Sequence, residues 1–388
     1  MHPIASWHDP GFMAAAFKVW IDPELLRTMA GHLSRAHVDF PRARFLKLAG
    51  NGLSALELKA RVMHVADALA ESLPAEFEDA ADVLEGTLAP ERSDENLSML
   101  VPCDQGLAGW AVWPMTDFVA RYGLSKPRRA LQALHALTKR NTAEYAIRPF
   151  VIAHRSMTMA TLERWVRDRS PHVRRLVSEG LRPRLPWGIQ LKHAIEDPSA
   201  ALPMLARLQD DDSEYVRRSV ANHLNDIAKD HPACVAEWLE EYLPGASKER
   251  RALLRHASRT LIKRGDRRVL KSWGLADPFR GAVDFVVEPS QVVVGGSVAL
   301  NAELRSCVEH PQQLMVDYVV HHVKKGGVIS KKTWKGWLFA LQPQASRKLC
   351  KRHSLRPVTT RVDYPGRHKV DLVINGEVVA SSVFDLRG

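Results

Sequence analysis

The sequence predicts a stack of α-helical repeats followed by a β-sandwich. Three observations support this two-part fold. Apolar residues recur every three or four positions through about the first 275 residues, a 43-residue repeat lies within that stretch, and after Asp277-Pro278 the apolar pattern changes to alternation. The chain has 388 residues, more than the ~250–300 that one hydrophobic core usually holds. We therefore expect two domains, residues 1–277 and 280–388.

The helical pattern is accompanied by an internal repeat. Helical spacing is clearest in Leu46–Leu73, Leu97–Tyr122, Arg128–Lys139 and Met159–Val166. Residues 168–181 align with residues 211–224 at a constant offset of 43, and each copy places turn residues before the pattern V-R-R-x-V-x-x-x-L. This period and pattern are typical of HEAT-type helical pairs, so we expect a HEAT-like α-solenoid.

The region after residue 280 reads as short strands. Period-two alternation or β-branched runs occupy residues 283–287, 291–294, 297–304, 315–323, 332–339 and 358–362. Two more runs, 369–374 and 378–384, flank Asn375-Gly376, the strongest short hairpin signal. Seven or so strands in about 110 residues predict an immunoglobulin-like β-sandwich.

Composition and motifs exclude several classes of protein. The chain is 45% hydrophobic and 26% charged, which is typical of a globular protein. It has no uncharged apolar run of about 18 residues, and His8 and Asp9 lie where a signal peptide needs an apolar core. We expect a cytoplasmic protein that acts at the bacterial nucleoid, with no membrane association.

Metal and nucleotide cofactors are not expected. The four cysteines form no C-x-x-C pair, and the adjacent His321 and His322 would point to opposite faces of a strand. The phosphate-binding patterns G-x-x-x-x-G-K-[ST] and G-x-G-x-x-G are absent.

The net charge of +11 is unevenly distributed. Residues 67–95 carry ten acids and one base, whereas residues 321–361 carry eleven bases and no acid. Lys331, Lys332 and Lys335 belong to the basic stretch. This distribution indicates a nucleic-acid-binding protein, because each neutralised phosphate releases a counterion. The alternative is a solvated basic surface that binds nothing specific.

One face of the helical repeat carries both positively and negatively charged side chains. Val173, Val177 and Leu181 form a core stripe at four-residue spacing, which leaves another face for polar side chains. The polar face presents Arg175, Glu179 and Arg182, then Arg218, Asn222 and Asp226 one repeat later, and Glu144 and Arg148 one repeat earlier. Arginines beside carboxylates and amides suit a ligand that has phosphates and a cationic group.

Three segments, 139–150, 170–188 and 213–227, closely resemble the AlkC family of DNA alkylation-repair glycosylases. The second, which runs from Ser-Pro-His-Val-Arg-Arg to Leu-Pro-Trp-Gly, is the most specific. The resemblance extends to the carboxy-terminal immunoglobulin-like domain of one branch of the family and is weakest over residues 1–60.

The resemblance implies excision of N3-alkylated bases, chiefly 3-methyladenine and 3-methylcytosine, from double-stranded DNA. It also implies capture of the lesion in kinked duplex without inserting the base into a protein pocket, unlike base-flipping glycosylases. Glu144, Glu179 and Asp226 correspond to acidic residues that face the lesion nucleotide, and Trp187 to the aromatic residue beside its sugar. The residues expected at the DNA are Trp187, Arg148, Arg175, Arg182, Arg218, Asn222, Lys331, Lys332 and Lys335.

Simpler explanations exist for each of these residues. Glu144 could pair with Arg148, and Glu179 with Arg175 or Arg182, as ordinary helix-surface ion pairs. Asp226 could bridge to a neighbouring arginine, and Trp187 could cap a core.

Two other functions compete with a monomeric, monofunctional glycosylase. A non-catalytic HEAT-repeat scaffold would bind nucleic acid by charge alone, and only base release distinguishes it. A protein-binding adapter would expose an apolar groove, whereas the face deduced here is rich in arginine.

Overall fold

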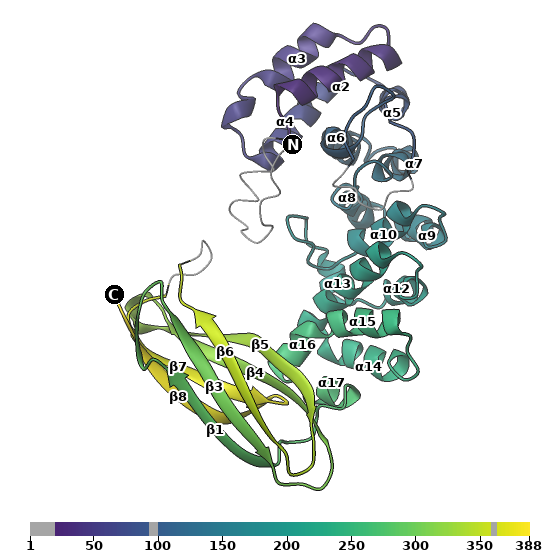
Figure 1. Ribbon diagram of the computed structural model, residues 1–388. Helices are drawn as coiled ribbons and strands as arrows, with labels where there is room; N and C mark the ends of the chain where they lie inside the picture. Colours follow the sequence, from purple (N-terminus) through teal and green to yellow (C-terminus); the bar gives the residue numbers. More distant parts are fainter. Residues whose placement is uncertain (1–19, 93–99, 358–362) are drawn as a thin grey trace. The chain divides into compact units, whose positions relative to one another are not determined.

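A computed structural model describes residues 20–92, 100–357 and 363–388 (Figure 1). Helices occupy the first part of the chain, and strands follow the last helix, as the sequence predicts. The helices are α2 (Pro23–Ala36), α3 (Arg42–Gly50), α4 (Leu58–Ala70), α5 (Phe77–Gly86), α6 (Val112–Tyr122), α7 (Pro127–Thr138), α8 (Arg148–Ala153), α9 (Arg155–Trp165), α10 (Pro171–Gly180), α11 (Lys192–Glu196), α12 (Leu202–Leu208), α13 (Glu214–Asp230), α14 (Pro232–Tyr242), α15 (Lys248–Ala257), α16 (Arg259–Arg264) and α17 (Arg267–Ser272). Short 3-10 turns lie at Leu53–Ala55 and Gly109–Ala111.

Two of the helical stretches read from the sequence are interrupted. Residues 46–73 divide between α3 and α4, because Gly52 adopts a left-handed conformation with φ of 72° after α3 ends. In the stretch 97–122, the α-helix begins only at Val112, and residues 97–99 lie outside the described part of the chain. Leu107 instead forms backbone hydrogen bonds with Thr87 and Ala89.

The 43-residue repeat is visible in matching hydrogen bonds. The Asp168 carboxylate accepts from the Ser170 amide at 2.8 Å, and one repeat later the Asp211 carboxylate accepts from the Ser213 amide at 3.0 Å. The arginine that follows in each copy, Arg174 or Arg217, donates to the two backbone carbonyls at the start of its own turn. The same residues therefore fix the same turn before α10 and before α13.

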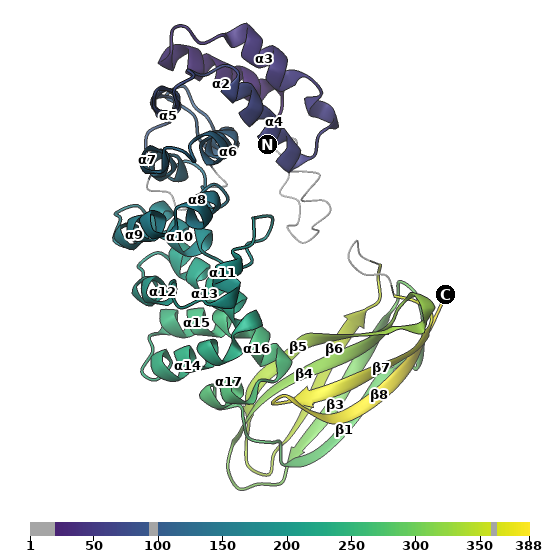
Figure 2. The same cartoon turned by 180° about the vertical axis from the view of Figure 1, so that it is seen from behind.

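Packing divides the chain into two compact units. The first contains the described residues up to His231 together with Ala246–Ala257. In it α10 packs against α13, and α13 against α15, so that helices of successive repeats lie side by side (Figures 1 and 2). The predicted core stripe, Val173, Val177 and Leu181, is buried in this unit.

The second unit contains Pro232–Gly245 and Ser258–Gly388. Its strands are β1 (Gly281–Glu288), β2 (Gln291–Val293), β3 (Ser297–Ser306), β4 (Gln312–Val323), β5 (Ile329–Leu341), β6 (Ser346–Ser354), β7 (Gly366–Ile374) and β8 (Glu377–Arg387). They form a three-stranded sheet in the order β1-β3-β6 and a five-stranded sheet in the order β2-β8-β7-β4-β5. The buried side chains of both sheets, such as Leu304 and Val316, share clusters between them, which makes a sandwich.

Two local features of the sandwich follow from particular residues. Asn375 and Gly376 both have positive φ, 50° and 84°, so the predicted tight hairpin between β7 and β8 is confirmed. Gly336 occupies a bulge in β5, where a Cβ atom would lie 2.3 Å from the Val316 carbonyl oxygen. The bulge brings Trp334 and Trp337, three residues apart, onto the same core-facing side.

Strand β6 was not predicted from the sequence; its nine residues include four lysines and arginines. Only Leu349 and His353 are buried along it, too few to show an alternating apolar pattern, and its partner β3 supplies most of the apolar surface. The strand predicted at 358–362 lies outside the described residues.

Candidate nucleic-acid interface and carboxylate site

Three carboxylates from separate segments of the first unit lie along one row of charges. Glu144 is in the turn before α8, Glu179 is in the last turn of α10, and Asp226 is in α13. Each side chain is at least nine-tenths buried. Since α10 and α13 pack together, the repeat brings Glu179 and Asp226 to neighbouring positions.

Two arginines link these carboxylates into an alternating row, which we call the carboxylate–arginine ladder: Glu144, Arg175, Glu179, Arg182 and Asp226. Arg175 Nη2 lies 2.8 Å from Glu144 Oε2 and 3.8 Å from Glu179 Oε2. Arg182 donates from Nη1 to Glu179 Oε1 at 2.5 Å and from Nε to Asp226 Oδ2 at 2.9 Å. The ladder fixes both oxygens of the central Glu179, because Ser219 Oγ also donates to Oε2 at 2.6 Å.

The ladder keeps its central carboxylate ionised. Burial alone would raise the pKa of Glu179, but the guanidinium groups of Arg175 and Arg182 and the hydrogen bonds from Ser219 and Arg182 hold that pKa below its ordinary value. At the other end of the ladder, Lys229 Nζ donates to Asp226 Oδ1 at 2.7 Å. Glu179 therefore keeps its negative charge at neutral pH.

Two tyrosines and a threonine that were not predicted from the sequence complete the surroundings of Arg175. The guanidinium carbon of Arg175 lies 4.9 Å from the centre of the Tyr215 ring, and Thr142 Oγ1 bridges Arg175 and Glu144. Burial raises the pKa of Tyr215 to about 12, and burial together with Glu144 raises the pKa of Tyr145. The signal for Tyr215 was its alignment with His172 at the 43-residue offset.

Arg148 differs from the expectation that it would contact DNA. Its side chain is completely buried, and its guanidinium donates to backbone carbonyls of Gly180, Arg182, Pro183 and Ile189. It does not form the i, i+4 ion pair with Glu144, which pairs with Arg175 instead. A side chain in this position cannot reach a phosphate at the surface.

Trp187 does not cap a core. It lies in the segment between α10 and α11, and 60% of its surface is exposed. Its φ of 64° is left-handed, which is unusual for a residue with a large side chain. Lys59 in α4 donates from Nζ to the Trp187 carbonyl oxygen at 3.0 Å. The indole is thus displayed to solvent from a constrained backbone.

The remaining predicted DNA contacts occupy two different units. In the first, Arg218 is exposed on α13, and Asn222 Oδ1 accepts a hydrogen bond of 2.9 Å from His256 Nε2. In the second, Lys331, Lys332 and Lys335 are exposed on β5, an edge strand of the five-stranded sheet. Arg175 and Arg182 are already paired with carboxylates, so Arg218 is the more available cation for a phosphate.

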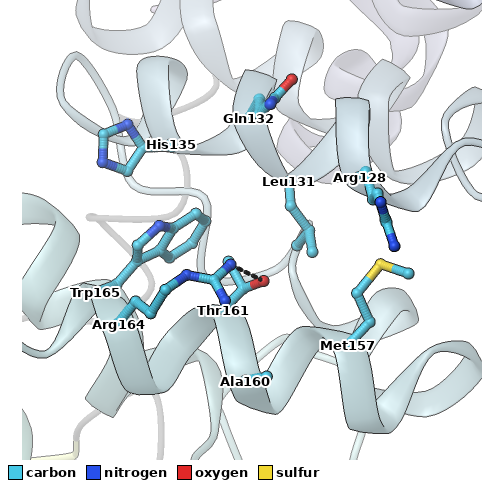
Figure 3. Close-up of a pocket in the computed structure, with 9 residues that line it drawn as sticks. All are labelled: Arg128, Leu131, Gln132, His135, Met157, Ala160, Thr161, Arg164 and Trp165. Atoms are coloured by element: carbon cyan, nitrogen blue, oxygen red, sulfur yellow. Dashed lines mark hydrogen bonds between the residues drawn. The ribbon is translucent and has the colours of Figure 1, made fainter.

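A separate hollow lies between α7 and α9 (Figure 3). Arg128, Gln132, Arg164 and Trp165 are among its lining residues, none of which belongs to the ladder. Within the part of the chain that the structure describes, no group of three or more histidine, cysteine, aspartate or glutamate residues is arranged to hold a metal ion. Over the same residues, no helix is long and apolar enough to cross a membrane.

Comparisons with known proteins agree with this architecture. The family model for DNA alkylation repair enzymes matches residues 138–261, which include the whole ladder. The model for the C-terminal Ig-like domain of the uncharacterised protein YhaZ matches residues 282–388, the β-sandwich. Helical repeats and sandwich together thus define a class of DNA alkylation repair enzyme with a carboxy-terminal immunoglobulin-like domain.

Two relatives match over nearly the whole length. The chain is 33% identical to the uncharacterized protein YhaZ of Bacillus subtilis (strain 168), over 96% of this chain and 99% of YhaZ. The structure of the Pseudomonas fluorescens alkylpurine DNA glycosylase AlkC, bound to DNA containing an abasic site analog, superposes with a TM-score of 0.87 at 33% identity, covering 96% of this chain and 99% of AlkC. The chain belongs to the family of AlkC and YhaZ.

Proposed function

We propose that this protein is a monofunctional DNA glycosylase that releases cationic N3-alkylated bases, 3-methyladenine and 3-methylcytosine, from duplex DNA and so initiates base excision repair. The carboxylate–arginine ladder carries the proposal, because it brings three buried carboxylates together in a chain similar throughout to a DNA glycosylase. The segment that follows α10 also exposes Trp187. The enzyme acts as a monomer without metal or nucleotide cofactor.

The charge of the lesion explains why such a site would suffice. Alkylation at N3 gives the base a positive charge, so it leaves without protonation by a general acid. The remaining barrier is the formation of a sugar with oxocarbenium character and its capture by water. Fixed carboxylates stabilise developing positive charge, and one of them can orient the water. Neutral lesions would gain much less, so we expect a narrow substrate range.

Each ladder residue has a role in this scheme. Glu144, Glu179 and Asp226 supply the negative charge that faces the lesion nucleotide. Arg175 and Arg182 hold those carboxylates in place rather than binding phosphates themselves, because their donors already point at carboxylate oxygens. Trp187 lies beside the lesion sugar, where its ring face can attract the cationic transition state by about 1–2 kcal/mol when water is excluded.

The DNA backbone would be held by cations in both predicted domains, 1–277 and 280–388. Arg218, with Asn222 near it, contacts phosphates from the helical repeats. Lys331, Lys332 and Lys335 contact the duplex from β5 and give the sandwich its DNA-gripping role. The duplex is kinked at the lesion, and the damaged base is not inserted into a protein pocket.

Base release from methylated duplex tests the proposal directly. The full chain is incubated with duplex DNA containing 3-methyladenine or 3-methylcytosine, and free bases are separated and quantified. Release of 3-methyladenine above the spontaneous rate supports the glycosylase. Tight, salt-dependent binding of the duplex with no base release would instead support a non-catalytic HEAT-repeat scaffold.

A further inference from the structure

Arg148 is the only wholly buried side chain among the arginines we expected at the DNA, and all its described hydrogen bonds go to backbone carbonyls. Nε donates to the Ile189 oxygen at 2.5 Å, Nη1 to the oxygens of Gly180 and Arg182 at 2.8 Å each, and Nη2 to the Pro183 oxygen at 3.4 Å. One planar guanidinium therefore joins the end of α10 to both sides of the segment that contains Trp187.

A lysine could not make the same set of contacts. The guanidinium directs donors from three nitrogens in one plane, whereas an ammonium group is a single point with three donors. The four carbonyls that Arg148 contacts belong to residues up to nine positions apart, so the fork sets the path of the chain between them. Burial, with Arg182 nearby, lowers the pKa of Arg148 to about 10, which reflects the cost of holding this charge among neutral partners.

The segment it holds has an unfavourable backbone conformation. Trp187 has a φ of 64°, and its ring is mostly exposed, so core packing of the indole does not impose this conformation. A backbone conformation of this kind is kept only where several surrounding contacts hold it in place. Here the surroundings are Arg148 from inside and Lys59, whose Nζ donates to the Trp187 carbonyl oxygen, from α4.

We propose that Arg148 is a positioning residue, which holds Trp187 at the DNA surface by fixing the carbonyls on both sides of it. This rests on the proposed function, in which Trp187 lies beside the lesion sugar. Arg148 also binds the Arg182 carbonyl, but the Arg182 side chain is held separately by its ion pairs with Glu179 and Asp226.

The test combines backbone hydrogen exchange with excision kinetics in the full chain. Arg148→Lys keeps the charge and removes the fork. We expect the amides of Gly188 and Leu191, which donate to the carbonyls of Leu185 and Pro183, to exchange at least roughly 10-fold faster, with the amides of α13 unchanged. Single-turnover release of 3-methyladenine should slow by about 10-fold, because a misplaced group next to the reacting atoms is costly.

Two controls separate positioning from general destabilisation and from phosphate binding. In a Trp187→Ala background, Arg148→Lys should cause no further loss of excision, since the residue through which it acts is gone. The salt dependence of duplex binding should match that of the unaltered chain, because a buried Arg148 contacts no phosphate. Losses that multiply in the double variant, or a shallower salt dependence, would overturn the proposal.

A milder variant covers the case in which Arg148→Lys does not fold. Lys59→Met removes the exposed anchor of Trp187 and leaves the core intact. It should speed exchange at Gly188 and slow excision by about 3-fold. This effect is smaller than that of Arg148→Lys, because Lys59 donates one hydrogen bond to a backbone carbonyl and Arg148 donates four. If Trp187→Ala excises at the normal rate, the proposed role of Trp187 is wrong, while exchange of the 185–191 amides still decides whether Arg148 holds the segment.

Discussion

Replacing Glu179 by glutamine tests whether the ladder supplies catalytic charge. The substitution removes one negative charge and nearly preserves shape. Glu179 Oε1 accepts from Arg182 and Oε2 from Ser219, so the glutamine amide can point its oxygen at Arg182 and its NH2 at the serine. The Ser219 hydroxyl can rotate to accept, which satisfies the new donor.

The structure indicates how large each effect should be. Arg182 keeps Asp226 and Arg175 keeps Glu144, so neither arginine loses all its carboxylate partners. Weakening one charge-assisted hydrogen bond should lower the free energy of unfolding by about 1–2 kcal/mol. Losing a fixed charge that stabilises the transition state should slow excision by roughly 100-fold or more, which corresponds to about 2.7 kcal/mol or more in activation free energy.

The assay measures single-turnover release of 3-methyladenine from duplex DNA, together with binding of duplex that contains an abasic site analog. Binding should stay within about 3-fold of the unaltered chain, because Glu179 contacts no phosphate in the proposed complex. Glu163→Gln is a matched control: Glu163 on α9 also pairs with an arginine, Arg207, but it is only half-buried and lies outside the ladder. An unchanged excision rate for Glu179→Gln, equal to that of this control, would refute the catalytic role of the ladder.

Three further predictions concern other groups. Asp226→Asn should also lose roughly 100-fold in single-turnover excision while still binding duplex, and Glu144→Gln should be impaired in the same assay; normal rates in both would contradict their roles. Burial, with Arg182 nearby, lowers the pKa of His223 from 6.5 to about 4. The contribution of the neutral histidine to stability is therefore fully present above pH 6.5. As the pH falls from 6.5 to 4, the unfolded chain takes up the proton first, so the free energy of unfolding should fall by about 3 kcal/mol. The free energy of urea unfolding should depend less on pH in His223→Gln than in the unaltered chain. An equal pH dependence in the two proteins would contradict the role given to His223. Neutralising Lys331, Lys332 and Lys335 of β5 together should weaken duplex binding and reduce the slope of its salt dependence by up to about 0.9 per lost phosphate contact. The control Lys369→Ala, which removes a lysine paired with Asp371, should change neither quantity. An unchanged slope in the triple variant would exclude a DNA-gripping role for the three lysines.

Local patterns in the sequence were enough to predict the two-part fold. Apolar periodicity reports which face of a helix or strand is buried, and the change of period near residue 280 marks where strands replace helices. The 43-residue offset predicted equivalent turns before α10 and α13, since the turn-forming residues lie within a few positions of one another. The hairpin at Asn375-Gly376 was predictable for the same reason: few residues other than asparagine and glycine accept its positive φ angles.

The choice of partners was decided by tertiary structure. Glu144 pairs with Arg175, 31 residues away, instead of with Arg148 four positions along the chain, because packing of the repeats brings the start of α8 beside α10. The strand β6 forms because β3 and the sandwich core offer it a partner and a surface, although its own sequence is mostly basic. The sequence predicted that Arg148 contacts DNA, yet in the folded chain its guanidinium donates to four backbone carbonyls. Helical spacing fixes the direction in which a side chain leaves its helix, but what it meets depends on segments distant in the sequence, and those are brought together only when the chain folds.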